Sequence, residues 1–290
     1  MHDINDRPMR VAAIHDLSGF GRCSLSVILP VLSAMGVQVC PVPTAVLSSH
    51  TGGLGEVAFR DLTDFIKPAL EHYKRLGIDF ECIYSGFLAS EEQIDHCLEF
   101  FSTYKDTLLV VDPVMGDHGK AYRTYTKRMR ERMGELVREA DIITPNLTEA
   151  SMLLNIDYPT APLTRTQAKS MLVRLSELGP EYVVITGVSM ATNEISNIGY
   201  DRKHNSFWYV PCDYVPVSYP GTGDIYASVL TGSLLNGDSL PMAMDRATRF
   251  LEITIKTTFT YDQDTRYGVM LEKSLPYLAQ RDILNNYKIL

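Results

Sequence analysis

The sequence predicts an α/β fold with a mostly parallel central sheet, helices on both faces and a short antiparallel edge. Two observations support this. Short apolar runs alternate with longer segments of helical periodicity, and such alternation builds parallel strands joined by right-handed crossovers. Polar motifs also follow the ends of these runs, where open α/β sheets bind ligands. No linker, repeat or charge block interrupts residues 1–290, so we expect a single domain.

The predicted strands are short and continuously apolar, as strands buried on both faces are. They cover residues 11–15, 37–42, 80–85, 108–112, 142–144 and 182–186. Residues 195–200 and 206–211 are more exposed in pattern and are expected to form the antiparallel edge.

The predicted helices carry apolar residues at three- and four-residue spacing. They cover residues 24–35, 57–76, 91–104, 123–138 and 166–178, and a further helix begins near Asp224. Gly36, Gly77 and Gly179 stand where C-caps belong.

Composition narrows the class of ligand. The 35 acidic and 27 basic residues give a net charge of −8, which disfavours a nucleic-acid surface but allows a nucleotide held by backbone N–H groups. The five cysteines form no C-x-x-C pair, so reduced thiols are expected. No apolar run approaches the roughly 20 residues that span a bilayer. Without a signal-peptide pattern, we expect a cytoplasmic protein with no membrane contact.

The strongest motif is the glycine loop at residues 220–224. Gly221, Thr222 and Gly223 open a helix, so that successive N–H groups and the helix dipole form an anion hole. Asp224 follows at once and is placed to take a proton from an attacking hydroxyl. Alternatively, Asp224 is only a first-turn carboxylate that favours the dipole.

Two further segments carry hard oxygen ligands. Residues 109–117 form an apolar strand that ends in Asp112 and Asp117, and residues 141–150 contain Asn146 and Glu149, three apart on one helix face. Mg²⁺ prefers such carboxylates together with water. Glu149 by itself is equally explained as a helix-capping residue.

Together these segments resemble the ribokinase superfamily and, within it, the pyridoxal kinases, over nearly the whole chain. The resemblance implies a catalytic loop of Gly221, Thr222 and Gly223 with Asp224 as the base. It implies Mg²⁺ at Asp112, Asp117 and Glu149, leaves activation by K⁺ open, and suggests a homodimer. The residues it implies for ATP are Asp112, Asp117, Tyr122, Thr144, Asn146, Glu149, Thr186 and Gly187.

Hydroxymethylpyrimidine kinases look similar, but usually carry cysteine where Asp224 stands and lack the carboxylate matching Asp117. Residues 43–51 and 84–88 are also similar to pyridoxal kinases, whereas residues 15–22 look closer to the pyrimidine kinases. The substrate-binding residues that the resemblance implies are Asp16, Ser18, Thr44, Ala45, His50 and Tyr84. The choice between Asp16 and Ser18 as the ring contact stays open, as does a plain turn role for His50.

We therefore expect ATP-dependent phosphorylation of the 5′-hydroxymethyl group of pyridoxal, pyridoxine or pyridoxamine, a step of vitamin B6 salvage, with the preferred vitamer open. One alternative is a hydroxymethylpyrimidine kinase of thiamine synthesis. A second is a non-catalytic protein that binds B6 vitamers, which the intact base, anion hole and metal segment disfavour.

Overall fold

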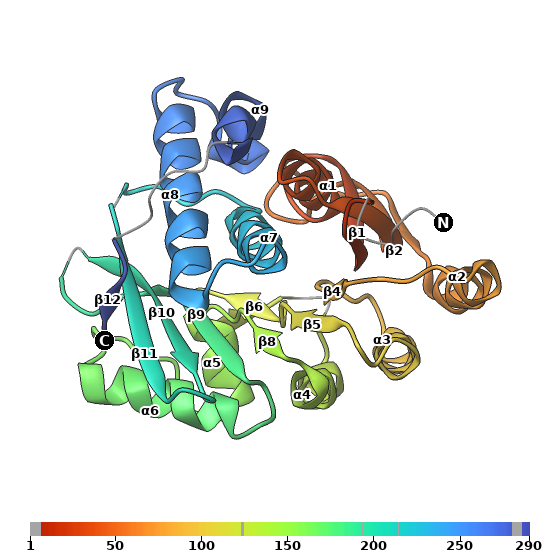
Figure 1. The fold of residues 1–290 in the computed structure, drawn as a ribbon. Coiled ribbons are helices and arrows are strands. Elements are labelled where there is room, and N and C mark those ends of the chain that lie inside the picture. Colours follow the sequence, from red (N-terminus) through yellow and green to blue (C-terminus); the bar gives the residue numbers. More distant parts are fainter. Residues whose placement is uncertain (1–6, 123–124, 193, 214, 280–285) are drawn as a thin grey trace.

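A ten-stranded sheet with helices on both faces organises the molecule (Figure 1). The computed structural model describes residues 7–122, 125–192, 194–213, 215–279 and 286–290. The strand order is β12-β11-β10-β9-β8-β5-β4-β1-β2-β3. The predicted fold class is confirmed.

The centre of the sheet is parallel, and its strands pair with one another directly. It consists of β1 (Arg10–Phe20), β2 (Gln38–Ser49), β4 (Cys82–Ser85), β5 (Leu108–Val111), β8 (Ile142–Ile143) and β9 (Tyr182–Val188). Because β1 lies between β2 and β4, the chain reverses its direction of progress across the sheet beside β1. Ligand sites of open α/β sheets form at such a switch point.

Antiparallel strands complete both edges. The predicted edge is β10 (Ile195–Asp201) with β11 (Ser206–Cys212), extended by β12 (Lys288–Ile289). The opposite edge is β3 (Phe59–Asp61), paired with β2. The sequence pattern assigned residues 57–61 to a helix, which is wrong for 59–61, because backbone pairing with β2 overrides the local apolar spacing.

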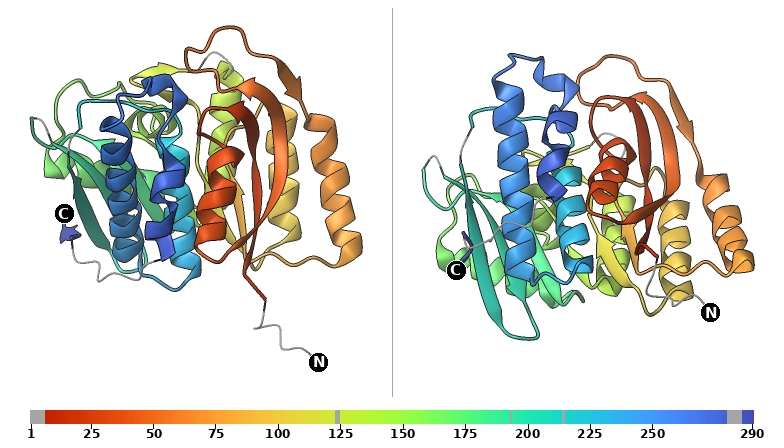
Figure 2. Two further views of the ribbon diagram at one scale, coloured as in Figure 1. Left: turned by 90° about the horizontal axis from the view of Figure 1, so that it is seen from above. Right: turned by 45° about the horizontal axis from the view of Figure 1, so that its top comes forward.

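The helices divide between the two faces (Figure 2). One face carries α1 (Leu25–Ala34), α7 (Thr222–Leu235), α8 (Leu240–Phe259) and α9 (Leu271–Ser274), followed by the 3₁₀ helix η3 (Leu275–Ala279). The other face carries α2 (Thr63–Leu76), α3 (Glu91–Thr103), α4 (Lys127–Glu139), α5 (Leu147–Leu153) and α6 (Arg165–Ser176). Arg123, the predicted start of the fourth helix, lies outside the described residues.

Alternation along β1 explains the two cores. Val11 and Ala13 pack with α1 and α7, whereas Ala12 and Ile14 pack with α2 and α3 on the opposite face. Successive strand side chains point to opposite faces, so one apolar strand serves both layers. Within the described residues, no helix combines the length and hydrophobicity needed to cross a bilayer.

β1 and β2 run further than predicted. β1 continues to Phe20 and β2 to Ser49, still paired in parallel, with a register shift between His15 and Leu17. The chain therefore turns away from the sheet only at Gly21, which has a φ of 92°. A register shift re-aims side chains, and this one lies at Asp16.

Candidate active site

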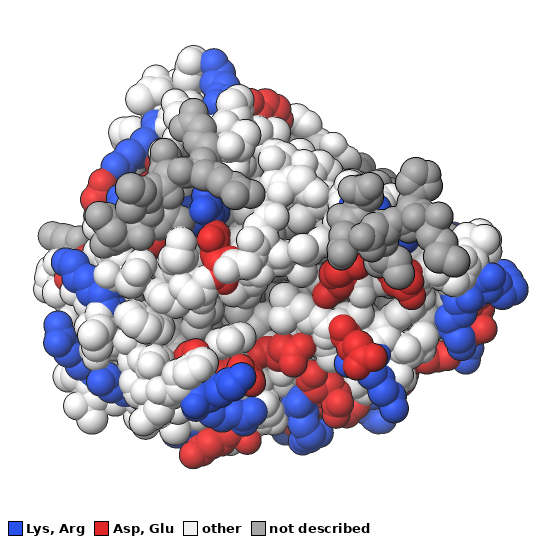
Figure 3. Space-filling view, in the orientation of Figure 1, with Lys and Arg blue, Asp and Glu red and all other residues white. Residues whose placement is uncertain are grey.

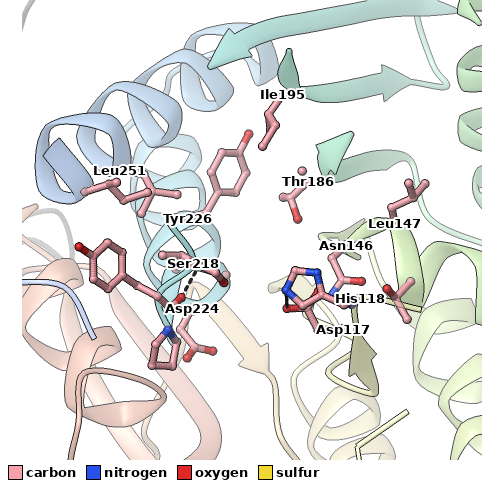
Figure 4. A pocket seen from close by; sticks show the side chains of 18 of the residues that line it. Asp117, His118, Asn146, Leu147, Thr186, Ile195, Ser218, Asp224, Tyr226 and Leu251 are labelled. Carbon is pink, nitrogen blue, oxygen red and sulfur yellow. Dashed lines mark hydrogen bonds and ion pairs between the residues drawn. The ribbon is translucent and has the colours of Figure 1, made fainter. Parts of the chain in front are cut away.

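A cavity of about 730 Å³ opens at the carboxyl ends of the parallel strands, a size typical of small-molecule sites. Figure 4 shows Asp224 on one side of it and Asp117 and Asn146 on the other. The structure thus brings together residues predicted from separate motifs. Those that line the cavity are His50, Asp112, Asp117, Tyr122, Thr144, Asn146, Glu149, Thr186, Gly187, Gly221, Thr222, Gly223 and Asp224.

The glycines at the start of α7 have different structural roles. Gly221, the N-cap, has a φ of 79°, and a Cβ there would lie 2.0 Å from the backbone oxygen of Arg22. Among the described residues, apart from its chain neighbours and the adjacent α7 backbone, Gly223 has no atom within 4 Å of the position a Cβ would take. In the described part of the chain, no side-chain hydrogen bond caps the first turn of α7. An anion can therefore approach N–H groups that the fold leaves accessible.

Asp224 is held through both carboxylate oxygens. Its Oδ2 accepts a hydrogen bond of 2.7 Å from the backbone N–H of Ser24, which precedes α1 and has a φ of 56°. Its Oδ1 lies 3.2 Å from Nε2 of His15, without the alignment of a good hydrogen bond. A non-glycine residue at positive φ is strained. The backbone N–H that binds Asp224 therefore belongs to a residue in an unfavourable conformation.

His15 was not among the predicted site residues. Its Nδ1 lies 2.9 Å from Oδ1 of Asp16, so the ring stands between two carboxylates. Burial lowers the pKa of His15, but the hydrogen bonds and charges of Asp16 and Asp224 outweigh burial and raise this pKa to about 10. The available sequence signal was a histidine next to an aspartate at a strand end, which only its tertiary contacts distinguish from an ordinary core histidine.

Asp112 and Glu149 are buried carboxyl groups that affect each other. Burial, followed by the negative charge of Asp224, raises the pKa of Asp112 to about 7. Burial, followed by the charge of Asp112, raises the pKa of Glu149 well above its usual range. Glu149 also caps α5: its Oε2 accepts the N–H of Asn146 at 2.9 Å and its Oε1 that of Met115 at 3.0 Å. Glu149 therefore does cap α5, as its sequence position allows.

The third predicted metal residue, Asp117, lies apart. It is exposed on the hairpin of β6 (Gly116–Asp117) and β7 (Lys120–Ala121). Within the described residues, no three His, Cys, Asp or Glu side chains gather closely enough to hold a metal ion. The pair Asp112 and Glu149 still fits Mg²⁺, which needs only one or two carboxylates when waters and phosphates complete its shell.

Most of the predicted substrate residues lie behind the cavity wall. Asp16, Ser18, Thr44, Ala45 and Tyr84 are buried and do not line the cavity. The Ser18 hydroxyl donates to Asp16 Oδ2 at 2.9 Å. The Thr44 hydroxyl donates to a backbone oxygen, whereas the Tyr84 hydroxyl has no partner within the described residues.

His50 lines the cavity, but backbone groups occupy both of its ring nitrogens. Nε2 lies 2.6 Å from the backbone oxygen of Arg266, and Nδ1 accepts the N–H of Gly52 at 3.0 Å. A Cβ on Gly21 would lie 2.3 Å from the ring. This geometry favours the interpretation of His50 as a turn histidine.

Comparisons with known proteins show the family to which the chain belongs. The family model described as phosphomethylpyrimidine kinase matches residues 29–268. The chain belongs to this family. It is 32% identical over 229 residues to the thiamine biosynthetic bifunctional enzyme of Arabidopsis thaliana, covering 77% of this chain but only 42% of that protein's length.

Two solved structures are similar over most of the chain. One is a Bacteroides thetaiotaomicron protein described as a phosphomethylpyrimidine kinase. It is 44% identical to this chain, with a TM-score of 0.95 and complete coverage of both chains. The other is the pyridoxal kinase of Lactobacillus plantarum, 31% identical, with a TM-score of 0.86, covering 93% of this chain and 96% of that one.

Family and relatives establish the class of reaction. The chain is an ATP-dependent phosphotransferase that acts on a hydroxymethyl group. The alternative of a non-catalytic binding protein is therefore set aside. Both pyridoxal and hydroxymethylpyrimidine kinases are among the relatives, so the family alone does not select the ring.

Proposed function

We propose that the acceptor is a vitamin B6 vitamer, phosphorylated at its 5′-hydroxymethyl group. The observation that carries this proposal is the Bacteroides thetaiotaomicron structure, 44% identical over 98% of this chain, which was determined with pyridoxal. Asp224 gives further support, because the similar pyrimidine kinases usually have cysteine at this position.

In this mechanism Asp224 acts as the general base. Its carboxylate takes the proton of the 5′-hydroxyl as the oxygen attacks the γ-phosphorus of ATP, and the bond to the β,γ-bridging oxygen breaks to release ADP. The first-turn N–H groups of α7, at Thr222, Gly223 and Asp224, stabilise the charge on the transferring group. Gly221 allows the close approach on which this arrangement depends.

Asp112 and Glu149 would hold Mg²⁺, directly or through water, with Asp117 nearer the solvent. When bound, the ion neutralises phosphate charge and orients the phosphates. Acidic side chains gather beside the hollow in the middle of the face shown in Figure 3. A nucleotide entering there needs a counter-charge, which the ion and the α7 N–H groups would supply.

The ends of β8 and β9 form the proposed nucleotide wall. Asn146 and Thr186 are bridged side by side there, and Gly187, with a φ of 68°, follows. The Thr144 hydroxyl is buried, lines the cavity and interacts with Asp112, so it lies where it can contact a phosphate oxygen beside the proposed metal. Tyr122 lines the same cavity.

For the acceptor ring we propose Asp16, Ser18, Thr44, Ala45 and Tyr84, with His50 shaping the entrance. The family resemblance adds a homodimer, which sedimentation velocity can measure. The resemblance does not decide whether K⁺ activates the enzyme, which a comparison of initial rates in K⁺ and Na⁺ can test.

The test is a panel of pyridine and pyrimidine alcohols assayed with Mg-ATP. A B6 vitamer should give the highest kcat/KM, ahead of hydroxymethylpyrimidine. A site that hydrogen-bonds the pyridine 3-hydroxyl discriminates by about 10⁴-fold or more against a ring without it, because its buried polar groups are left unpaired. Equal turnover of both rings would contradict the B6 assignment.

The second candidate is a hydroxymethylpyrimidine or phosphomethylpyrimidine kinase. The matching family model and the likeness of residues 15–22 to the pyrimidine kinases favour it. It predicts the opposite ranking, with the pyrimidine alcohol or its monophosphate as the best acceptor in the same panel.

A further inference from the structure

The imidazole of His15 joins two carboxylates from distant parts of the chain. Nδ1 lies 2.9 Å from Oδ1 of Asp16 on β1, and Nε2 lies 3.2 Å from Oδ1 of Asp224 on α7. His15 is 2% exposed. Bulk water therefore cannot substitute for either contact.

These contacts determine the charge of the ring. Two carboxylates against the two ring nitrogens favour the imidazolium, the form that carries a proton on each nitrogen. The backbone N–H of Asp16 also lies 2.9 Å from Nδ1, a contact between adjacent residues that would suit an unprotonated nitrogen. The charge-assisted contact with the Asp16 carboxylate is the stronger of the two, and the pKa of His15, raised to about 10, agrees with it.

The groups around His15 keep the ring in this orientation. A Cβ on Gly86, after β4, would lie 2.0 Å from Cδ2 of His15, so that strand end lies directly against the ring. Tyr84 meets it edge-on, with ring centroids 6.4 Å apart. Within the described residues, other titratable groups that interact with this cluster are Asp112, which follows β5, Cys23 in the loop before α1, and Tyr122.

We propose that His15 is a positioning residue for phosphoryl transfer: as an imidazolium it links Asp16 to Asp224 and, with the Ser24 N–H, fixes the Asp224 carboxylate. This inference rests on Asp224 being the base of the proposed function. His15 keeps its proton throughout, since the hydroxyl proton passes to Asp224. It also offsets the charge of the neighbouring carboxylates, beside which the phosphates must bind.

Two amide variants separate positioning from simple packing. His15→Gln keeps a neutral donor near the place of Nε2 and can still reach Asp224, whereas His15→Asn keeps one near the place of Nδ1 and reaches only Asp16. We expect kcat to fall about 10-fold in His15→Gln and about 100-fold in His15→Asn, with KM for ATP changed less than about 3-fold. Equal kcat values in two folded variants would overturn the proposal.

The matched control is His204→Gln. His204 also pairs with an aspartate, Asp201, at 2.7 Å, but it is exposed and remote from the cavity. Its loss should leave kcat and the pH profile unchanged. In His15→Gln the acid limb of kcat/KM should move to higher pH, because removing a cation makes the neighbouring carboxylates easier to protonate. An unmoved acid limb would contradict the proposal.

A measurement on the unaltered protein covers the case in which neither variant folds. The ¹⁵N chemical shifts of the buried, slowly exchanging histidine should report an imidazolium from about pH 6 to 9. A neutral ring at pH 8 would overturn the proposal. This measurement needs no acceptor. The proposed function fails separately, if Asp224→Asn keeps its activity or the substrate panel favours pyrimidines.

Discussion

The two halves of the cavity rim differ in how completely their polar groups are already paired. On the nucleotide side, at the ends of β5, β8 and β9 and the start of α7, the predicted residues line an open cavity. On the acceptor side, at the ends of β1, β2 and β4, Asp16, Ser18 and Thr44 are buried and bonded within the protein. The nucleotide side is thus preorganised, whereas acceptor binding must exchange internal hydrogen bonds for bonds to the ligand.

The largest effect should come from the group where the two sides meet. Asp224→Asn is expected to lower kcat by about 10²–10⁴-fold with little change in ATP binding, because the general base is lost while its shape is kept. Initial rates and nucleotide titration measure this. Asp201→Asn, at a carboxylate that pairs with His204 and does not line the cavity, should retain full activity. An Asp224→Asn variant with more than about a tenth of the activity would place the base elsewhere.

The two glycines of the α7 loop test the preorganised side. Gly221→Ala should lose about 100-fold in kcat and lower the melting temperature, because alanine is strained at a φ of 79° and its Cβ would meet the Arg22 oxygen. Gly223→Ala has room and should melt normally. If phosphate binds at this helix start, Gly223→Ala will still raise KM for ATP several-fold. A normal KM would move the phosphate away from α7.

Substitution of Glu149 tests whether a carboxylate that caps a helix also binds Mg²⁺. We expect Glu149→Gln to raise the Mg²⁺ concentration for half-maximal rate about 10-fold, since the carboxylate charge is lost. Unfolding should become easier by about 1–3 kcal/mol, because the amide cannot accept both backbone N–H groups. The structure offers a matched control in α6, where Gln167 fills the same capping position. Gln167→Glu should leave the Mg²⁺ titration unchanged, and an unchanged titration in Glu149→Gln would remove Glu149 from the metal site.

The smallest expected effect concerns the acceptor side and is a change in how the melting temperature depends on pH. The pKa of His15 is raised from 6.5 to about 10 in the folded protein. The stability this provides is complete below about pH 6.5 and is lost as pH rises towards 10, because only the folded state keeps the proton through that range. Between pH 6.5 and 9.5 the melting temperature should fall several degrees more in the native protein than in His15→Gln. His204→Gln should follow the native curve, and parallel curves for native protein and His15→Gln would argue against a buried imidazolium.

The sequence by itself determined the fold class and the nucleotide side of the cavity. Asp112, Thr144 and Thr186 lie at or next to the carboxyl ends of apolar strands, and parallel strands place all such ends along one rim. Local pattern therefore sufficed to group residues from separate motifs. The Gly221 to Asp224 loop was also recognisable locally, because a glycine loop that opens a helix forms an anion site wherever it occurs.

Only the tertiary structure decided the acceptor side. The contact between Ser24 and Asp224 joins residues 200 positions apart, and the place of His15 between Asp16 and Asp224 depends on a register shift in β1 that apolar periodicity does not encode. The strand β3 also depends on tertiary structure, because it forms by pairing with β2 where the sequence pattern predicts a helix. So does the position of His50, whose ring nitrogens contact backbone groups. Each of these features rests on backbone pairing or packing between distant segments, and the energy of such contacts is absent from any short stretch of sequence.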